Sequence, residues 1–334
     1  MTVLITGGAG YIGAHVVRLA GLAGRDVVVV DDFSTGSAAR IDDVRTLRLD
    51  VAEPSSVPEL AGLMRSAHVA TVMHLAARKQ VAESMVRPAW YYQQNVTGLA
   101  NVLAAMEAAG VRQLVFSSSA AVYGNPTAAI VTEESATCPV SPYGETKLVG
   151  EWLLRDAARA WGLRAASLRY FNVAGAGWPD LGDPETTNLI TMVLDRLSRG
   201  DRPEIFGNDY PTPDGTCVRD FVHVMDLARA HLAALDHVSG AGRGHDVFNV
   251  GTGTGSSVLQ VVAGLIAATG ARSAPKFTAA RPGDAASFVA SVDRIADRLG
   301  WRAQAGLPEI LASAWSAWQL RPAAAASPGS VVAQ

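Results

Sequence analysis

Residues Thr6 to Gly13 read TGGAGYIG, and this glycine-rich stretch decides the fold. The apolar run just before it, Val3 to Ile5, predicts a strand, and the residues after it predict the first helix. Gly7, Gly10 and Gly13 have the spacing G-x-x-G-x-x-G, which permits a tight turn and brings the backbone close to a pyrophosphate at a helix N-terminus. The stretch therefore predicts a dinucleotide-binding turn.

Short apolar runs alternate with helical patterns through the first half of the chain. They predict parallel strands joined by right-handed helical crossovers. Each run is continuously apolar, so helices are expected on both faces of the sheet. The runs are Val3 to Ile5, Val27 to Val30, Leu47 to Leu49, Thr71 to Leu75, Leu114 to Ser117 and Ala165 to Leu168. The fold class is therefore α/β, a doubly wound parallel sheet of the Rossmann type.

Loop-rich sequence follows Asn172, where glycines and prolines interrupt the regular patterns. We expect residues 1–172 to form a cofactor-binding domain, to which the chain returns near 218–250. Residues 173–321 are expected to form a smaller α/β domain for the substrate, and residues 322–334 a loose tail. The later elements predicted are helices at 188–198, 258–268 and 307–318 and a strand at 248–250.

Composition narrows the functional classes. The chain has 334 residues, of which 49% are hydrophobic and 18% charged, as in a globular protein. A net charge of −3, with both signs scattered, speaks against nucleic acid as a partner. We expect no membrane span and a cytoplasmic location. Two cysteines and seven histidines show no metal-ligand spacing, so no metal is expected.

Two acidic residues follow the early strands. Asp31 ends the second predicted strand, where a carboxylate can accept both ribose hydroxyls of an adenosine. No basic residue lies between Asp31 and Ala39 to bind a 2′-phosphate, and Asp32 would repel one, so NAD is favoured over NADP. Asp50, after the third strand, is placed to receive the adenine amino group, and a helix-capping role for it is equally open.

A tyrosine and a lysine provide the candidate chemistry. In SPYGETK, Tyr143 and Lys147 stand at i and i+4 and share one face of a helix expected from Ser141 to about Trp161. An ammonium and a nicotinamide cation nearby would stabilise the phenolate, which could then remove a hydroxyl proton. Ser119, at the end of the fifth strand, could bridge Tyr143 and a substrate.

The order of the motifs resembles that of the UDP-galactose 4-epimerases in the extended short-chain dehydrogenase/reductase family, over about residues 2–320. The motifs are TGGAGYIG, Asp31, HLAA, KQVAES, NVTG, SSSAAVYG, SPYGETK, RYFNVAGA, FGNDYPTPDGT and VRDFVHVMDLA. The resemblance implies tightly held NAD beneath a UDP-sugar. It assigns Lys79, Asn95, Ser119, Tyr143 and Lys147 to the reaction centre, and Tyr11, Ile12 and Val51 to the cofactor. It places Phe171 and Asn172 beside the hexose, and Asn188, Leu189, Phe206, Arg219, Arg281 and Asp284 around the UDP.

Related dehydratases and decarboxylases carry acidic residues after the serine or threonine, where this chain has Ala120 and Ala121. Without that acid and base, reversible oxidation at C4 is the expected chemistry. The resemblance therefore implies an isomerase of the UDP-glucose 4-epimerase type. Two alternatives stay open. The substrate could be a UDP-N-acetylhexosamine or a UDP-uronic acid, or the chain could be a non-catalytic NAD sensor, although Tyr143 and Lys147 are both present.

Two finer expectations concern size and assembly. In RPGDAASF, Phe288 stands where the resemblance places a gate residue beside the hexose, and an aromatic ring there favours plain over N-acetylated sugars; Phe288 as a simple core aromatic is the alternative. A homodimer is also expected, because two helices carry apolar residues on more than one face. These residues are Val96, Leu99, Val102 and Leu103 on the first helix, and Leu148, Trp152 and Leu153 on the second.

Overall fold

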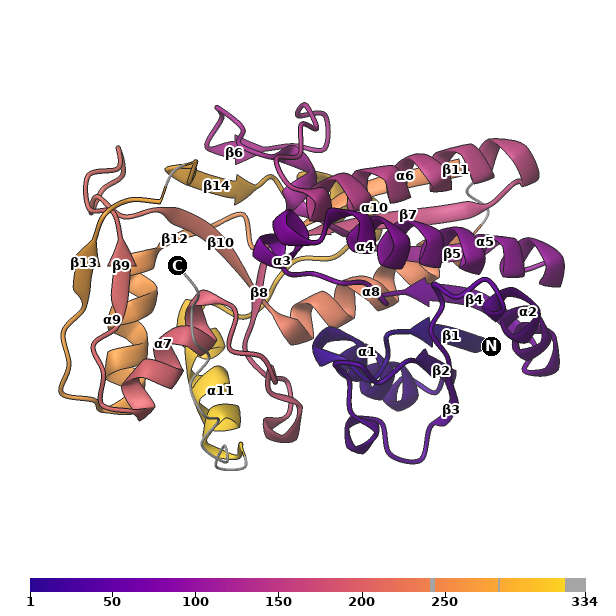
Figure 1. Cartoon of the computed structure of the whole chain (residues 1–334), viewed down its shortest axis with the longest axis horizontal. Helices are drawn as coiled ribbons and strands as arrows, with labels where there is room; N and C mark the ends of the chain where they lie inside the picture. Colours follow the sequence, from indigo (N-terminus) through magenta and orange to yellow (C-terminus); the bar gives the residue numbers. More distant parts are fainter. Residues whose placement is uncertain (241–243, 282, 322–334) are drawn as a thin grey trace.

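The strand before the glycine turn lies inside the main sheet. In the computed structural model, which describes residues 1–240, 244–281 and 283–321, seven parallel strands follow the order β11-β7-β5-β4-β1-β2-β3 (Figure 1). They are β1 Thr2–Thr6, β2 Asp26–Asp31, β3 Arg45–Arg48, β4 Val69–His74, β5 Gln113–Ser119, β7 Arg164–Tyr170 and β11 Gly244–Val250. The predicted fold class is confirmed. Two strands end one residue earlier than predicted: β3 ends before Leu49 and β4 before Leu75.

Helices cover both faces of this sheet, as the continuous apolar runs predicted. Val3 and Ile5 face one core, shared with α1 (Tyr11–Leu22) and α8 (Val224–Ser239). Leu4, between them, faces the opposite core, which helices α2, α5 and α6 complete. The bounds of these three helices are α2 Ser56–Ser66, α5 Gly98–Ala109 and α6 Pro142–Trp161. Alternate residues of a strand therefore bury themselves in two separate cores.

The remaining elements gather beside one end of the main sheet. Strands β12, β10, β14 and β6 form a second sheet, with β8 paired to β10, and β13 pairs with β9. The strands are β6 Ile130–Val131, β8 Asn172–Ala174, β9 Glu204–Phe206, β10 Val218–His223, β12 Gly255–Ser257, β13 Lys276–Thr278 and β14 Ser287–Ala290. Helices α7 Leu189–Ser198, α9 Val258–Thr269 and α11 Leu307–Gln319 pack around a third core.

Short helices complete the chain. They are α3 Val81–Val86, α4 Pro88–Tyr92, α10 Asp293–Leu299, the π-helical segment Gln93–Thr97 and the 3-10 helices Ala38–Arg40, Ala120–Tyr123 and Pro179–Leu181. The strand expected at 248–250 and the helices at 188–198, 258–268 and 307–318 are confirmed within a few residues. The predicted loose tail, 322–334, lies outside the described residues. None of the described helices has both the length and the apolar character that crossing a bilayer requires.

Candidate active site

The glycine turn joins β1 to α1 at the carboxyl edge of the sheet. Gly7 has a φ of +70°, a conformation that side chains rarely adopt. A Cβ on Gly13 would lie 2.1 Å from the Gly7 carbonyl oxygen, so only glycine lets the helix begin this close to the turn. Gly10 caps α1 without a side-chain hydrogen bond, which leaves the first N–H groups of the helix available to a ligand. The turn is suited to an anion such as a phosphate.

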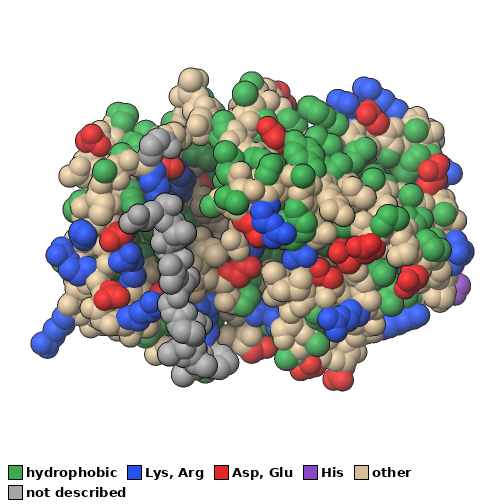
Figure 2. Space-filling view, viewed as in Figure 1, with side chains coloured by type: hydrophobic (Ala, Val, Ile, Leu, Met, Phe, Trp, Pro, Cys, Tyr) green, Lys and Arg blue, Asp and Glu red, His purple; other side chains and the backbone are tan. Residues whose placement is uncertain are grey.

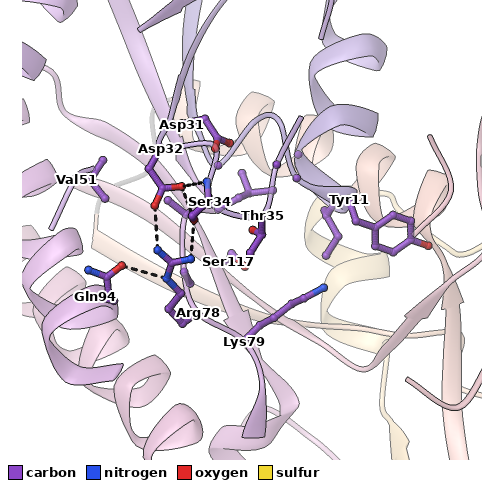
Figure 3. Close-up of a pocket in the computed structure, with 18 of the residues that line it drawn as sticks. Tyr11, Asp31, Asp32, Ser34, Thr35, Val51, Arg78, Lys79, Gln94 and Ser117 are labelled. Atoms are coloured by element: carbon purple, nitrogen blue, oxygen red, sulfur yellow. Dashed lines mark hydrogen bonds and ion pairs between the residues drawn. The ribbon is translucent and has the colours of Figure 1, made fainter. Parts of the chain in front are cut away.

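A cavity of about 320 Å³ opens over this turn at the carboxyl ends of the central strands (Figure 3). Ligands of open α/β sheets bind at this edge. Most of the residues predicted to bind the cofactor line it, namely Gly7, Gly10, Tyr11, Ile12, Gly13, Asp31, Asp50, Val51, Lys79, Tyr143 and Lys147. The structure therefore brings together residues that are spread over more than a hundred positions of the chain.

The two acidic residues are held in fixed orientations. Asp31 accepts hydrogen bonds from the backbone N–H groups of Ala9, at 2.9 Å, and Phe33, at 2.8 Å. Burial raises the pKa of Asp31, and these two hydrogen bonds oppose the rise. Asp50 lines the cavity and accepts from the N–H of Ala52 at 2.8 Å, within the turn that precedes α2. The N-cap of α2 is Ser55, so the helix-capping alternative for Asp50 is wrong.

Helix α6 carries the tyrosine and the lysine. It begins where the Ser141 hydroxyl accepts from the N–H of Gly144 at 3.2 Å, with proline in the first helical position. The Lys147 ammonium donates to the carbonyl oxygen of Ser117 at 2.8 Å, which ties the helix to the end of β5. It lies 5.8 Å from the centre of the Tyr143 ring. The predicted pairing on one helix face is thus present in the fold.

Burial disfavours charge on both of these groups. Lys147 is only 3% exposed, and burial lowers its pKa to about 7. Burial also raises the pKa of the Tyr143 phenol, while hydrogen bonding with Ser119 opposes that rise. The predicted phenolate is therefore not favoured by the protein alone. A positive charge brought into the cavity would favour it.

Ser119 lies at the point where β5 ends. Its hydroxyl accepts from the N–H of Ala121 at 3.1 Å and so caps the 3-10 helix Ala120–Tyr123. Although it does not line the 320 Å³ cavity, its hydrogen bonding with Tyr143 places it beside the phenol. The serine is therefore positioned next to the tyrosine, as the sequence predicted.

Of Asn95 and Lys79, only Lys79 lines the cavity. The Asn95 side chain accepts from the N–H of Arg78 at 2.8 Å and donates to its carbonyl and to Thr146, both at 3.0 Å. It does not line the cavity, because its amide is used to hold the loop after β4 against α6. Lys79 does line the cavity, and its ammonium lies 3.1 Å from a carboxylate oxygen of Glu185.

The residues predicted to bind UDP lie outside this cavity but fall into contacting pairs. The Arg281 guanidinium lies 3.8 Å from the centre of the Phe206 ring. The Arg219 guanidinium lies 3.9 Å from Asp284 and donates to the carbonyl of Ala285 at 2.7 Å. Two arginines and an aromatic face are a suitable set for a base and a diphosphate.

Around the predicted hexose, two rings touch. Phe288 on β14 has its ring centre 5.0 Å from that of Phe171, and it packs partly buried against the cluster that contains Phe171. Asn172 opens β8 and is exposed. Asn188 caps α7, accepting from the N–H of Thr191 at 3.1 Å, and Leu189 is the first residue of that helix. Neither the gate interpretation of Phe288 nor the core interpretation is excluded by this packing.

Sequence reasoning missed Arg78. Its guanidinium pairs with Asp32 at 2.9 Å and donates to the Ser34 hydroxyl at 2.6 Å and to Gln94 at 3.1 Å, all within the cavity lining (Figure 3). Arg78 is far from Asp31 in sequence and comes from the loop after β4, which is separated from β2 by β1 in the sheet. In a chain with so many arginines, no local signal distinguishes this one; its position beside Lys79 is the only pointer.

Comparison with known proteins agrees with this geometry. Residues 3–251 match the model of the NAD dependent epimerase/dehydratase family. A UDP-glucose 4-epimerase of Azospirillum brasilense is 44% identical over 304 residues, covering 90% of this chain and 86% of that protein. One from Corynebacterium glutamicum is 40% identical over 322 residues, covering 95% of each.

A solved structure gives the same result. The UDP-glucose 4-epimerase of Stenotrophomonas maltophila, crystallised with NAD and formylated UDP-arabinopyranose, superposes with a TM-score of 0.90 at 38% identity, covering 96% of this chain and 98% of that one. The agreement extends over both the main sheet and the elements beside it. On these grounds the chain belongs to the NAD dependent epimerase/dehydratase family.

Proposed function

We propose that this chain is an NAD-dependent 4-epimerase of UDP-hexoses that interconverts UDP-glucose and UDP-galactose. The observation that carries the proposal is the group of Tyr143, Lys147 and Ser119, in which Lys147 is buried, with alanine at positions 120 and 121. This arrangement offers one proton-transferring group beside the cofactor cavity and no carboxylate on the turn after β5. It is suited to reversible oxidation of a hydroxyl rather than to elimination.

The cavity fits NAD. The uncapped N-terminus of α1 and the close approach of Gly13 to Gly7 provide a cradle for the pyrophosphate. Asp31 and Asp50 stand at strand ends suited to the adenosine, and Lys79 lines the same cavity as Tyr143 and Lys147. When bound, NAD supplies the hydride acceptor for C4 and a positive charge beside the phenol.

The chain's own groups move the proton. Tyr143, as phenolate, takes the proton of the 4-hydroxyl, directly or through Ser119, while C4 is oxidised to a ketone. Lys147 is anchored on the carbonyl of Ser117 and favours the phenolate whenever it is protonated. The ketone turns about the diphosphate and is reduced on its other face, and Tyr143 then returns the proton. Because oxidant and reductant are regenerated each turn, no external redox partner is consumed.

In this reaction the UDP portion of the substrate must stay bound while the hexose remains free to rotate. Arg219 and Arg281 are the proposed contacts to the UDP portion, with Phe206 beside Arg281, Asp284 beside Arg219, and Asn188 and Leu189 at the start of α7. Phe171, Asn172 and Phe288 are the proposed neighbours of the hexose. Charged contacts hold the diphosphate, whereas the aromatic surface permits the sugar to rotate.

A homodimer is proposed, with an interface that differs from the predicted one. Leu99, Val102, Leu103 and Leu148 are buried inside the subunit, because α5 and α6 pack on each other, α5 also packs on α2, and α6 packs on the sheet. Predicting them as an exposed patch was wrong. The exposed apolar residues of α3, α4 and α6 form the α3–α6 patch, namely Val81, Met85, Val86, Tyr92 and Trp152. Figure 2 shows hydrophobic side chains gathered over this part of the molecule.

The domain division and the location are likewise proposals. We assign residues 1–172, with the return near 218–250, to the cofactor and residues 173–321 mainly to the sugar nucleotide. The separate cores of the main sheet and of α7, α9 and α11 support this division. A cytoplasmic location is consistent with two cysteines that form no disulfide.

The test is direct. Purified protein without added NAD is incubated with UDP-glucose, UDP-N-acetylglucosamine and UDP-glucuronic acid, and C4 epimers are followed by NMR. Formation of UDP-galactose as the fastest product is expected. Faster epimerisation of either other sugar would move the assignment to that substrate class. No epimer from any sugar, with NAD bound to the protein, would favour a non-catalytic NAD sensor.

A further inference from the structure

A single arginine links the two sides of the cofactor cavity. Arg78 belongs to the loop after β4, whereas Asp32 and Ser34 belong to the loop after β2. The guanidinium pairs with Asp32 at 2.9 Å and donates to the Ser34 hydroxyl at 2.6 Å (Figure 3). Asp32 in turn accepts from the N–H and the hydroxyl of Ser34, at 2.9 and 2.6 Å. The loop after β2 is therefore held by its own hydrogen bonds.

The arginine is fixed from its own side as well. The backbone N–H and carbonyl of Arg78 both bond the Asn95 side chain, which is buried. Its Nε donates to Gln94 at 3.1 Å, and the guanidinium lies 5.0 Å from the centre of the Trp90 ring. A side chain with a fixed backbone and several directed hydrogen bonds loses little further freedom when it bridges the two loops.

The residues that form and support the Arg78–Asp32 bridge line the cavity itself. Asp32, Ser34, Arg78, Gln94 and Trp90 all belong to the lining that includes the glycine turn. The Arg78 and Asp32 side chains are only 19% and 29% exposed, so their attraction is less screened than that of a surface pair. The bridge therefore connects two loops that both contribute to the lining of this cavity.

We propose that Arg78 is a positioning residue that retains NAD by bridging the loops after β2 and β4; the inference rests on the proposed function. An epimerase that returns the hydride to its own substrate loses a turnover whenever the cofactor escapes between the two half-reactions. Arg78 lies at the loops and not at Tyr143, so it acts on the lifetime of the bound cofactor rather than on the chemical step.

The experiment measures release of the cofactor. Protein loaded with NAD and freed of excess is diluted, and free NAD is followed by a coupled dehydrogenase that consumes only the unbound nucleotide. Arg78→Met is expected to release NAD about tenfold to a hundredfold faster than the unaltered chain, as loss of charged hydrogen bonds implies. Arg78→Lys should lie between the two, because lysine keeps the charge but not the planar fork.

Arg87→Met is the matched control. Arg87 also lies on Trp90, 3.8 Å from the ring centre, and pairs with Glu83, but it is exposed and absent from the cavity lining. Its substitution removes the same charge and the same type of stacking without cutting the bridge, so release should stay within about twofold of the unaltered chain. Equal release rates for Arg78→Met and Arg87→Met would overturn the proposal.

A double-mutant cycle separates bridging from general damage. Asp32→Asn alone should accelerate release, and adding it to Arg78→Met should accelerate release no further, because the same bridge is already cut. Fully additive effects would contradict the pairing. Urea unfolding of the cofactor-free variants checks the fold, and faster release explained wholly by lost stability would also overturn the proposal.

The release assay needs no sugar, so it tests the retention role of Arg78 independently of the proposed epimerase reaction. If the unaltered chain epimerises no UDP-sugar and yet Arg78→Met releases NAD faster, the retention role stands and the proposed reaction falls. If epimerisation is observed but release does not respond to Arg78, the reverse holds. With both correct, excess NAD should restore turnover by Arg78→Met, which separates an effect on cofactor occupancy from an effect on kcat.

Discussion

At Tyr143, burial and the proposed chemistry change the pKa of the phenol in opposite directions. Burial raises it, and only hydrogen bonding with Ser119 opposes that rise within the protein. Tyr143→Phe keeps the ring packing and removes the proton acceptor, so epimerisation should fall by about 10² to 10⁴. Turnover of UDP-glucose measured by NMR checks this, with bound NAD determined separately. Turnover equal to that of the unaltered chain would refute the proposed role.

A second prediction concerns Lys147, because folding lowers its pKa from 10.5 to about 7. Above pH 7 the unfolded chain binds one more proton than the cofactor-free folded chain, so this group makes stability rise with pH up to about 10.5. Lys147→Met lacks that term. The stability of Lys147→Met relative to the unaltered chain should therefore fall by about 1.4 kcal/mol per pH unit above pH 7.

Urea unfolding of both cofactor-free proteins at pH 7, 8 and 9 measures this difference. All other titrating groups are shared by the two chains, so they cancel. Parallel stability curves for the two proteins across this range would show that Lys147 keeps its charge in the fold.

Phe288 gives a prediction about substrate size. Replacing this ring, which lies against Phe171, with a smaller side chain opens space beside the proposed hexose position. Phe288→Cys should improve kcat/KM for UDP-N-acetylglucosamine about tenfold relative to UDP-glucose. Phe288→Tyr preserves the ring and should keep the original preference. If Phe288→Cys impairs both sugars equally, the ring is a core residue and not the gate.

The sequence predicted those parts of the site whose residues lie close together in the chain. The glycine spacing, Asp31 at a strand end, and Tyr143 four residues before Lys147 each depend on a few neighbouring positions. Arg78 acquires its role only when β4 is placed beside β1 and its loop meets Asp32. Such a contact between distant loops leaves no periodic signal in a chain rich in arginine.

Helix α6 connects the reactive residues to a buried ion pair. Glu151, two turns after Tyr143, accepts from Arg169 on β7 at 2.6 and 2.9 Å and from the Ser118 hydroxyl at 2.6 Å. Both side chains are about 5% exposed. Glu151→Leu would leave Arg169 buried without its carboxylate, which should lower the free energy of unfolding by about 3–5 kcal/mol.

Urea unfolding of Glu151→Leu measures this loss. The control is Asp156→Asn on the same helix, which removes an exposed pair with Arg155 and should leave the free energy of unfolding nearly unchanged. A similar small cost for Glu151→Leu would mean that Arg169 finds another partner in the altered chain.

At the level of elements, sequence predicted the strands that are continuously apolar. Two strands of the second sheet, β10 and β6, were missed, each for a different reason. β10 carries Arg219 and Asp220 in its middle, and β6 has only two residues, Ile130 and Val131. Their pairing with β14 and β12 comes from tertiary contacts, which override weak local preference.

For the whole molecule, the α3–α6 patch is the proposed interface of the homodimer. Trp152 is 47% exposed and is the residue that α6 contributes to this patch. Trp152→Glu places a charge there and should convert the proposed dimer to a monomer at micromolar concentration, as measured by light scattering. Ile130→Glu, at an equally exposed apolar residue of β6, should leave the assembly unchanged. A monomeric unaltered chain would rule out the dimer.

The last strand of the main sheet arrives late in the chain. β11 pairs with β7 although the whole segment from 171 to 243 lies between them, and α8 within that segment covers the face formed by Val3 and Ile5. A nascent chain that has emerged only as far as residue 172 therefore has six strands of the main sheet and an apolar face that α1 alone covers. During synthesis this half depends on α8 and β11 for its completion, and a gene cut at that point would encode an aggregating fragment rather than a portable nucleotide-binding unit.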